Sequence, residues 1–167
     1  AWARRGTVGA PPPRHPGRRI AGVGLPATVC GAWEPVLRVL IAVTHLLGVG
    51  HLARAAALAE AFADAGHDVL LVSGGRPHTH HLPGKGVRTA QLPAVHALGA
   101  DFVNLRDDKD ESVTPAYLED RARHLVRYAA DFSPDCIVTE TFPFGRNALR
   151  REFQALLDYC LLYTSPS

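Results

Sequence analysis

Two glycines and two histidines follow the first apolar run of the patterned part of the chain. The run spans residues 39–43, and His45, Gly48, Gly50 and His51 come after it. Glycine lacks a Cβ, so the backbone can turn sharply and a ligand can approach closely; fold and ligand would both need small residues there. An imidazole titrates near neutral pH and can take a proton from a reacting hydroxyl. This spacing predicts a ligand-binding loop. In it, His51 lies where the loop opens onto the ligand, or it only caps the next helix or hydrogen-bonds the loop, and His45 lines the same cleft or is buried.

Two later loops carry further candidates. Gly74 and Gly75 follow a second apolar run, and Glu140 follows a fourth predicted strand. Glu140 could orient His51 or accept a hydrogen bond from a ligand hydroxyl. The simpler interpretation is a loop carboxylate that pairs with Arg146.

The hydrophobic pattern predicts the elements that position these residues. Short apolar runs indicate buried strands, and apolar residues at helical spacing indicate helices. We expect strands at 39–43, 68–73, 87–92 and 135–139, and helices at 51–65, 115–130 and 146–158. Gly66 is placed to end the first helix, and Thr114 and Pro115 to begin the second. Residues 94–113 are predicted to form a long polar loop.

The order of these elements predicts the fold class. Strands that alternate with helices at such lengths indicate an α/β fold with a Rossmann-like, doubly wound parallel sheet. In such a sheet, ligands bind at the carboxyl ends of the strands. Loops at 44–51, 73–81 and 140–145 each follow a predicted strand. The candidate residues are therefore expected to meet along one edge of the sheet.

Composition excludes several classes of protein. The chain has 167 residues, 47% of them hydrophobic, which suits a globular domain with a core. Residues 1–35 hold five arginines and one glutamate, which account for more than the whole formal net charge of +2, so the rest carries no basic surface for nucleic acid. No apolar run reaches the roughly 20 residues that span a bilayer, and no secretory signal is visible. The three cysteines are odd in number and far apart, which favours a reducing cytoplasm.

The two ends of the chain differ from the part between them. Residues 1–35 are rich in proline, glycine and arginine and lack periodicity, which predicts a disordered or non-native upstream segment. A basic tail for an acidic partner is the alternative. Residues 36–158 are expected to form the folded domain. Residues 160–167 resemble a translated sequencing adapter, so residues 159–167 are expected to be a non-native tail, which would make the chain a fragment.

The segment 48–53 matches the dinucleotide-binding pattern G-x-G-x-x-A. Two features argue against NAD(P). Four residues separate the strand from Gly48, whereas this turn usually follows its strand closely. The second strand ends at Ser73, with no carboxylate for a ribose hydroxyl pair. An NAD(P)-binding oxidoreductase is therefore not the preferred interpretation, and it is kept only as the alternative.

Two patterns imitate metal sites. His78, His80 and His81 lie in a loop with proline and glycine and lack a fourth ligand at zinc spacing, so we expect a solvated loop. Asp108 and Asp110 form a D-x-D pattern in an acidic run just before a predicted helix, where solvation and the helix dipole explain them. We therefore predict no metal site.

Three segments together resemble the N-terminal domain of a GT-B glycosyltransferase. They are residues 45–54 (HLLGVGHLAR), 66–75 (GHDVLLVSGG) and 134–146 (PDCIVTETFPFGR). The nearest resemblance is to predicted bacterial glycosyltransferases related to the peptidoglycan GlcNAc transferase (family 28-like), and it covers residues 37–158. It implies the acceptor-side half of a two-domain enzyme that moves a sugar from a nucleotide-diphosphate sugar to an acceptor hydroxyl. A fragment without the donor-binding C-terminal domain is expected to be inactive alone.

The resemblance also implies roles for the candidate residues. His51 aligns with the histidine that several relatives use as general base, and Glu140 is the second catalytic candidate. The substrate-binding candidates are Gly48, Gly50, His45, Gly74 and Gly75. No cofactor is expected, since the nucleotide sugar is a substrate. The partners would be that donor and a hydroxyl acceptor in the cytoplasm, with peripheral contact to the inner face of the membrane if the acceptor is a lipid. A non-catalytic nucleotide- or sugar-binding module is the second alternative.

Overall fold

The computed structural model describes residues 35–145 and 147–164 of the chain. From Val36 onward they belong to one structural unit. The segment 1–35, predicted to be disordered or non-native, lies outside the described residues except for Pro35. Arg146 and the last three residues of the predicted tail also lie outside them.

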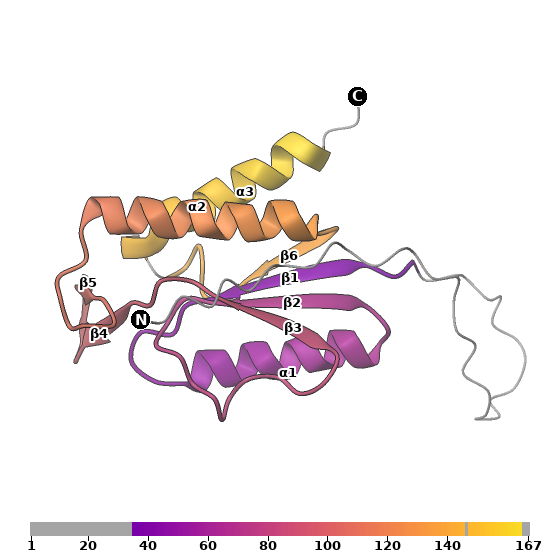
Figure 1. The fold of residues 1–167 in the computed structure, drawn as a ribbon, viewed down its shortest axis with the longest axis horizontal. Helices are drawn as coiled ribbons and strands as arrows, with labels where there is room; N and C mark the ends of the chain where they lie inside the picture. Colours follow the sequence, from indigo (N-terminus) through magenta and orange to yellow (C-terminus); the bar gives the residue numbers. More distant parts are fainter. Residues whose placement is uncertain (1–34, 146, 165–167) are drawn as a thin grey trace, which may run out of the picture. The chain divides into compact units, whose positions relative to one another are not determined.

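A four-stranded parallel sheet forms the centre of this unit (Figure 1). Its strands are β1 (Arg38–Val43), β2 (Asp68–Ser73), β3 (Val87–Gln91) and β6 (Cys136–Thr139), in the spatial order β3-β2-β1-β6. β1 pairs in parallel with β2 on one side and with β6 on the other. The two central strands, β1 and β2, are continuous apolar runs, as burial on both faces requires. The predicted parallel sheet is confirmed.

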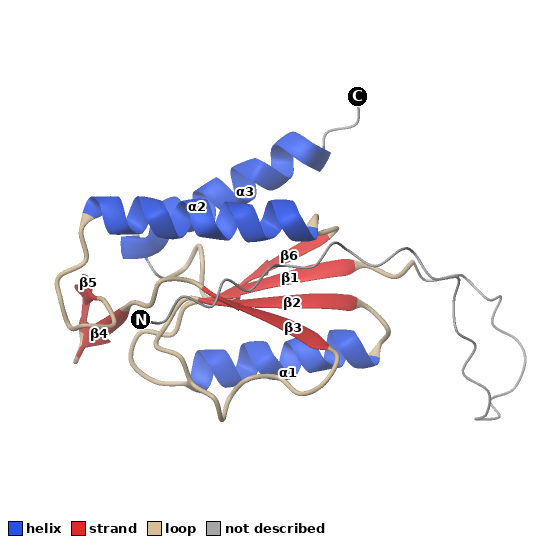
Figure 2. Ribbon diagram, viewed as in Figure 1, coloured by secondary structure: helices blue, strands red, loops and turns tan. Residues whose placement is uncertain are grey.

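Helices cover both faces of the sheet (Figure 2). α1 (Gly50–Asp64) packs on one face, and α2 (Pro115–Phe132) and α3 (Arg150–Thr164) pack on the other. The described part of the chain is therefore an α/β fold, as predicted, and is compatible with a Rossmann-like arrangement.

The alternation of side chains along β1 divides the core into two layers. Val39, Ile41 and Val43 belong to the cluster with α1, and Leu40 and Ala42 belong to the cluster with α2 and α3. Burial of each large apolar side chain stabilises the fold by about 1.5–3 kcal/mol. Because both layers share β1, this strand and the loop that follows it are held from both sides.

Local signals set two helix ends where the sequence predicts them. Gly66 follows α1 at φ = 91°, a left-handed conformation that glycine adopts without a steric penalty. The Thr114 hydroxyl oxygen accepts a hydrogen bond from the Tyr117 amide at 3.2 Å, and Pro115 occupies the first helical position of α2. The predicted start of α2 and the predicted glycine stop of α1 are confirmed.

The prediction of a polar loop at 94–113 is wrong in part. This segment contains an antiparallel hairpin of β4 (His96–Leu98) and β5 (Asp101–Arg106). Gly99, at φ = 55°, makes the two-residue turn between the strands. β4 has only three residues, and β5 (DFVNLR) has neither a continuous apolar run nor a regular alternation, so neither strand could be recognised from the sequence.

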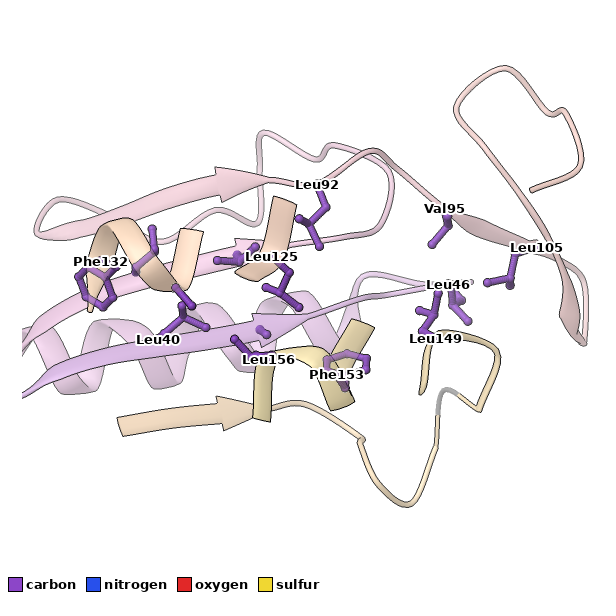
Figure 3. Close-up of a cluster of buried hydrophobic side chains, with 14 of the residues drawn as sticks. Leu40, Leu46, Leu92, Val95, Leu105, Leu125, Phe132, Leu149, Phe153 and Leu156 are labelled. Carbon is purple, nitrogen blue, oxygen red and sulfur yellow. The ribbon is translucent and has the colours of Figure 1, made fainter. Parts of the chain in front are cut away.

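Apolar contacts attach this hairpin to the rest of the core. Figure 3 shows Leu46, Val95, Leu105 and Leu149 grouped beyond the tips of the strands. Leu46 belongs to the loop after β1, whereas Val95 and Leu105 come from the hairpin segment. The hairpin is therefore fixed beside the loop that leads into α1.

The last helix begins and ends later than predicted. A 3-10 turn at Asn147–Leu149 precedes α3, which starts at Arg150 and runs to Thr164. Tyr159 packs partly buried against the core, so the packed face of α3 continues past Asp158. Among the described residues, no helix has the length and apolar character needed to cross a membrane.

Candidate functional site

The carboxyl edge of the sheet brings His51 and Glu140 into contact. His51 is the second residue of α1, and Glu140 directly follows β6. Because β6 lies next to β1, the loops after these strands are neighbours, and the Glu140 amide donates to the Ala42 carbonyl oxygen at 3.0 Å. His51 Nδ1 and Glu140 Oε1 lie 2.9 Å apart. This geometry corresponds to orientation of His51 by Glu140, whereas Arg146, the simpler partner, lies outside the described residues.

The carboxylate determines which ring nitrogen carries the hydrogen. An ionised carboxylate can only accept, so His51 Nδ1 donates to Glu140 and Nε2 is the nitrogen that can accept a proton. Arg54, one turn along α1, lies 3.2 Å from the same Glu140 oxygen through its Nε. Its Nη2 also lies 3.3 Å from His51 Nδ1, but two donors cannot bond to each other. We therefore assign the hydrogen to the shorter, charge-assisted contact with Glu140.

His51 and Arg54 line an open cavity of about 380 Å³. The other residues that line it are Leu47, Gly48, Gly50 and Phe102. A cavity of this size accommodates a small molecule. Leu47 is 59% exposed and Phe102 is 44% exposed, so large apolar side chains are open to solvent beside the histidine. The cavity thus combines a proton acceptor, an arginine balanced by a carboxylate, and an apolar rim.

Gly48 and Gly50 line this cavity, but the fold itself does not require them. A Cβ built on either residue meets no atom within 4 Å, and neither glycine has a positive φ. The expectation that the fold needs glycine at these positions is therefore wrong, because the backbone conformation is open to other residues. What the two glycines provide is space in the cavity that a side chain would otherwise occupy.

Gly74, Gly75 and His45 belong instead to the packed interior. His45 is 3% exposed, and its Nε2 lies 2.9 Å from the carbonyl oxygen of Arg76. A Cβ on Gly75 would lie 2.5 Å from His45 Cε1, and one on Gly74 would lie 2.6 Å from Arg121 Nη2. Packing at the end of β2 therefore requires both glycines. None of these three substrate-binding candidates is among the residues that line the 380 Å³ cavity.

The patterns that imitate metal sites have other contacts. Asp110 Oδ1 lies 2.7 Å from Arg76 Nη2 and 2.9 Å from His96 Nε2. The His78 and His45 rings lie 5.4 Å apart between centroids. Within residues 35–145 and 147–164, no three His, Cys, Asp or Glu side chains are placed to hold a metal ion.

Three residues that line the cavity were not singled out from the sequence. Arg54 had a usable signal, because residues three apart on a helix share a face and His51 was already a candidate. Leu47 adjoins Gly48 in the same predicted loop. Phe102 had no signal of its own, because it lies on the hairpin strand β5 that the sequence did not reveal.

Comparison of the chain with protein-family models, with curated proteins and with solved structures found no match. Function is therefore inferred from the geometry of the site. That geometry is a histidine–glutamate pair beside a cavity, at the edge where parallel α/β sheets bind their ligands.

Proposed function

We propose that this chain is the acceptor-side, N-terminal domain of a GT-B glycosyltransferase. The enzyme moves a sugar from a nucleotide-diphosphate sugar to an acceptor hydroxyl. The observation that carries the proposal is the 2.9 Å contact between His51 Nδ1 and Glu140 Oε1 at the carboxyl edge of the sheet. Both residues lie in the segments that resemble this family.

The reaction needs a proton acceptor at the attacking hydroxyl. His51 Nε2 takes the hydroxyl proton while the oxygen forms its bond to the anomeric carbon. The bond from that carbon to the diphosphate oxygen breaks, and the nucleoside diphosphate leaves with the electron pair. Glu140 accepts the hydrogen bond from Nδ1 and stabilises the imidazolium that forms. The products are the glycosylated acceptor, the nucleoside diphosphate and a proton on His51.

The cavity supports an acceptor rather than a diphosphate on this domain. Its arginine, Arg54, already lies 3.2 Å from the Glu140 carboxylate, so its charge is balanced. Its rim includes the exposed apolar side chains of Leu47 and Phe102. We therefore assign the donor diphosphate to a second Rossmann-like domain, as the family resemblance implies.

The other two functions fit these observations less well. A dinucleotide-binding oxidoreductase would use a carboxylate at the end of the second strand, where this chain has the buried Ser73 followed by Gly74. A non-catalytic binding module has no need of an oriented proton acceptor. The contact between His51 and Glu140 therefore favours the transferase.

Removal of the imidazole tests the proposal. In the protein that carries both domains, release of nucleoside diphosphate is measured from a panel of nucleotide-diphosphate sugars mixed with hydroxyl acceptors. We expect His51→Ala to lower kcat by about 10²–10⁴-fold, the usual contribution of a general base. The KM for the acceptor should change much less.

His80→Ala is the matched control. His80 is an exposed histidine in the loop after β2 and does not line the cavity. Its replacement should leave kcat unchanged. An unaltered kcat in His51→Ala would end the assignment of His51 as base, and absence of transfer from every donor in the native protein would end the proposed function.

A further inference from the structure

A buried arginine on α2 has a hydrogen-bond acceptor for each N–H group of its guanidinium. Arg121 is 0% exposed and Glu152, on α3, is 2% exposed. Arg121 Nε donates to Glu152 Oε2 at 2.9 Å, and Nη2 donates to Glu152 Oε1 at 3.0 Å. Nη1 donates to the carbonyl oxygens of Gly74, at 3.0 Å, and Pro93, and Nη2 also lies 3.5 Å from Thr44 Oγ1. A guanidinium has five N–H groups, and these contacts use all five.

Each loop partner of Arg121 stands at the carboxyl end of a different strand. Thr44 directly follows β1, Gly74 directly follows β2, and Pro93 lies just after β3. One side chain thus joins the ends of three neighbouring strands to α3. Gly74 leaves room for this side chain, since a Cβ there would lie 2.6 Å from Nη2.

The same contacts continue to the walls of the cavity. The Gly74 carbonyl oxygen that Arg121 contacts also accepts the Val95 amide at 3.1 Å, at the start of the hairpin segment. The Ala97 amide, on β4, then donates to the Leu46 carbonyl oxygen at 2.8 Å. Leu46 directly precedes Leu47 in the loop after β1, and the hairpin carries Phe102. The two cavity walls that present an apolar side chain, this loop and the hairpin, are therefore connected to the Arg121 guanidinium through hydrogen bonds.

Stability alone does not account for a buried ion pair at this place. Removing two charges from water is costly, and an apolar pair of similar volume often stabilises a core equally well or better. An apolar pair cannot bond to three loop acceptors at once. The planar, five-donor fork of arginine can hold several acceptors in one geometry.

We infer that Arg121, oriented by Glu152, is a positioning residue that fixes the loop at 44–50 and the β4–β5 hairpin, which form the two walls of the cavity with an apolar side chain. A single short loop connects Thr44 to His51 at the start of α1, so the position of this loop also determines the position of the imidazole. The catalytic consequence rests on the proposed function, whereas the effect on the loops does not.

Hydrogen exchange on the chain itself tests this inference. Arg121→Met/Glu152→Leu replaces the ion pair by an apolar pair of similar length. We expect the amides of Val95 and Ala97, which donate to the Gly74 and Leu46 carbonyl oxygens, to exchange at least roughly tenfold faster, while amides of β1 and β2 keep their protection. The imidazole NMR signals of His51 should also shift. In the two-domain protein, kcat should fall more than the KM for the donor changes.

Arg123→Met/Asp120→Leu is the matched control, because these residues form an exposed ion pair of 2.9 Å on the same helix. It should leave all these readouts unchanged. If the Arg121→Met/Glu152→Leu variant does not fold, Arg121→Lys decides, since an ammonium has three donors and cannot satisfy all five contacts.

Unchanged exchange and unchanged His51 signals in a folded variant would overturn the inference. Failure of both variants to fold would also overturn it, because the pair would then be required for the fold as a whole. Inactivity of the native protein would end the proposed function but would leave the exchange result standing.

Discussion

His51 Nδ1 and Glu140 Oε1 are 2.9 Å apart although 89 positions separate the two residues in the chain. The contact exists because the last strand of the sheet, β6, lies beside the first, β1, and points the same way. Both residues follow their strands at the same edge. The carboxylate holds the hydrogen on Nδ1, which leaves Nε2 to accept a proton.

Replacement of Glu140 should act through His51. We expect Glu140→Ala to lower kcat, but by less than His51→Ala, because the imidazole remains and has lost only its orienting partner. The double variant His51→Ala/Glu140→Ala should be no slower than His51→Ala alone, since residues that act as a unit are not additive. Steady-state kinetics of the four proteins measures this.

Glu119→Ala, an exposed glutamate on α2, is the control and should be neutral. If the loss of kcat in the double variant equals the product of the two single losses, Glu140 acts independently of His51, for instance by contacting the substrate.

The glycines of the two loops should respond in opposite ways to the same substitution. A Cβ on Gly50 meets open space in the first turn of α1, so Gly50→Ala should keep or raise stability, by up to about 1 kcal/mol. Gly75→Ala forces a Cβ against His45 and should lower stability by roughly 1–3 kcal/mol. Thermal unfolding followed by circular dichroism compares the two variants.

Gly50→Ala should nevertheless weaken ligand binding, although it does not destabilise the fold. Gly50→Ala fills part of the space beside His51 and should raise the acceptor KM without loss of fold. Equal destabilisation by both substitutions would contradict the placement of these loops.

Acid should loosen the β4–β5 hairpin. The backbone amide of Asn104, its side-chain amide and the backbone amide of Val103 donate to the Asp101 carboxylate and hold the pKa of Asp101 below its ordinary value of 3.8. A lowered pKa in the folded state means that this carboxylate stabilises the hairpin above pH 3.8 and ceases to do so as the pH falls through the lowered pKa.

NMR of the Val103 and Asn104 amides between neutral and acid pH follows this change. Their shifts should move with the ionisation of Asp101, and the exchange of both amides should rise on protonation. Asp101→Asn should abolish the pH dependence of both signals, because the amide does not titrate. Persistence of the dependence in that variant would assign it to another group.

Chelation should leave transfer intact. The Asp110 carboxylate is engaged by Arg76 and His96, and Asp107 Oδ1 accepts from the amides of Lys109 and Glu111, so these acidic side chains have structural partners. We expect EDTA to leave kcat of the proposed two-domain glycosyltransferase unchanged, and Asp108→Asn to do the same. A loss of activity that Mg²⁺ or Mn²⁺ restores would contradict this prediction.

Signals that act over a few neighbouring residues could be read from the sequence. These signals are the apolar runs of β1 and β2, the glycine that ends α1 and the cap of α2. They depend on backbone geometry and on the spacing of apolar residues, both of which adjacent residues determine. Gly66 needs only its own lack of a Cβ, and Thr114 needs only the amide three positions later. The parallel sheet then followed from the alternation of elements.

Contacts between distant segments could not be read in this way. Nothing near Glu140 in the chain indicates whether it pairs with His51 or with Arg146, because the choice depends on which strand lies next to β1. Arg121 appears in the sequence as one polar residue on an amphipathic helix, and only packing shows it buried against Glu152. The hairpin is held in place by Val95 and Leu105, which share a buried cluster with Leu46 beyond the carboxyl ends of the sheet strands. Composition and period thus determined the layers of this protein, whereas tertiary packing decided its polar partners, because a buried charge takes its partner from whatever the fold brings within hydrogen-bonding distance.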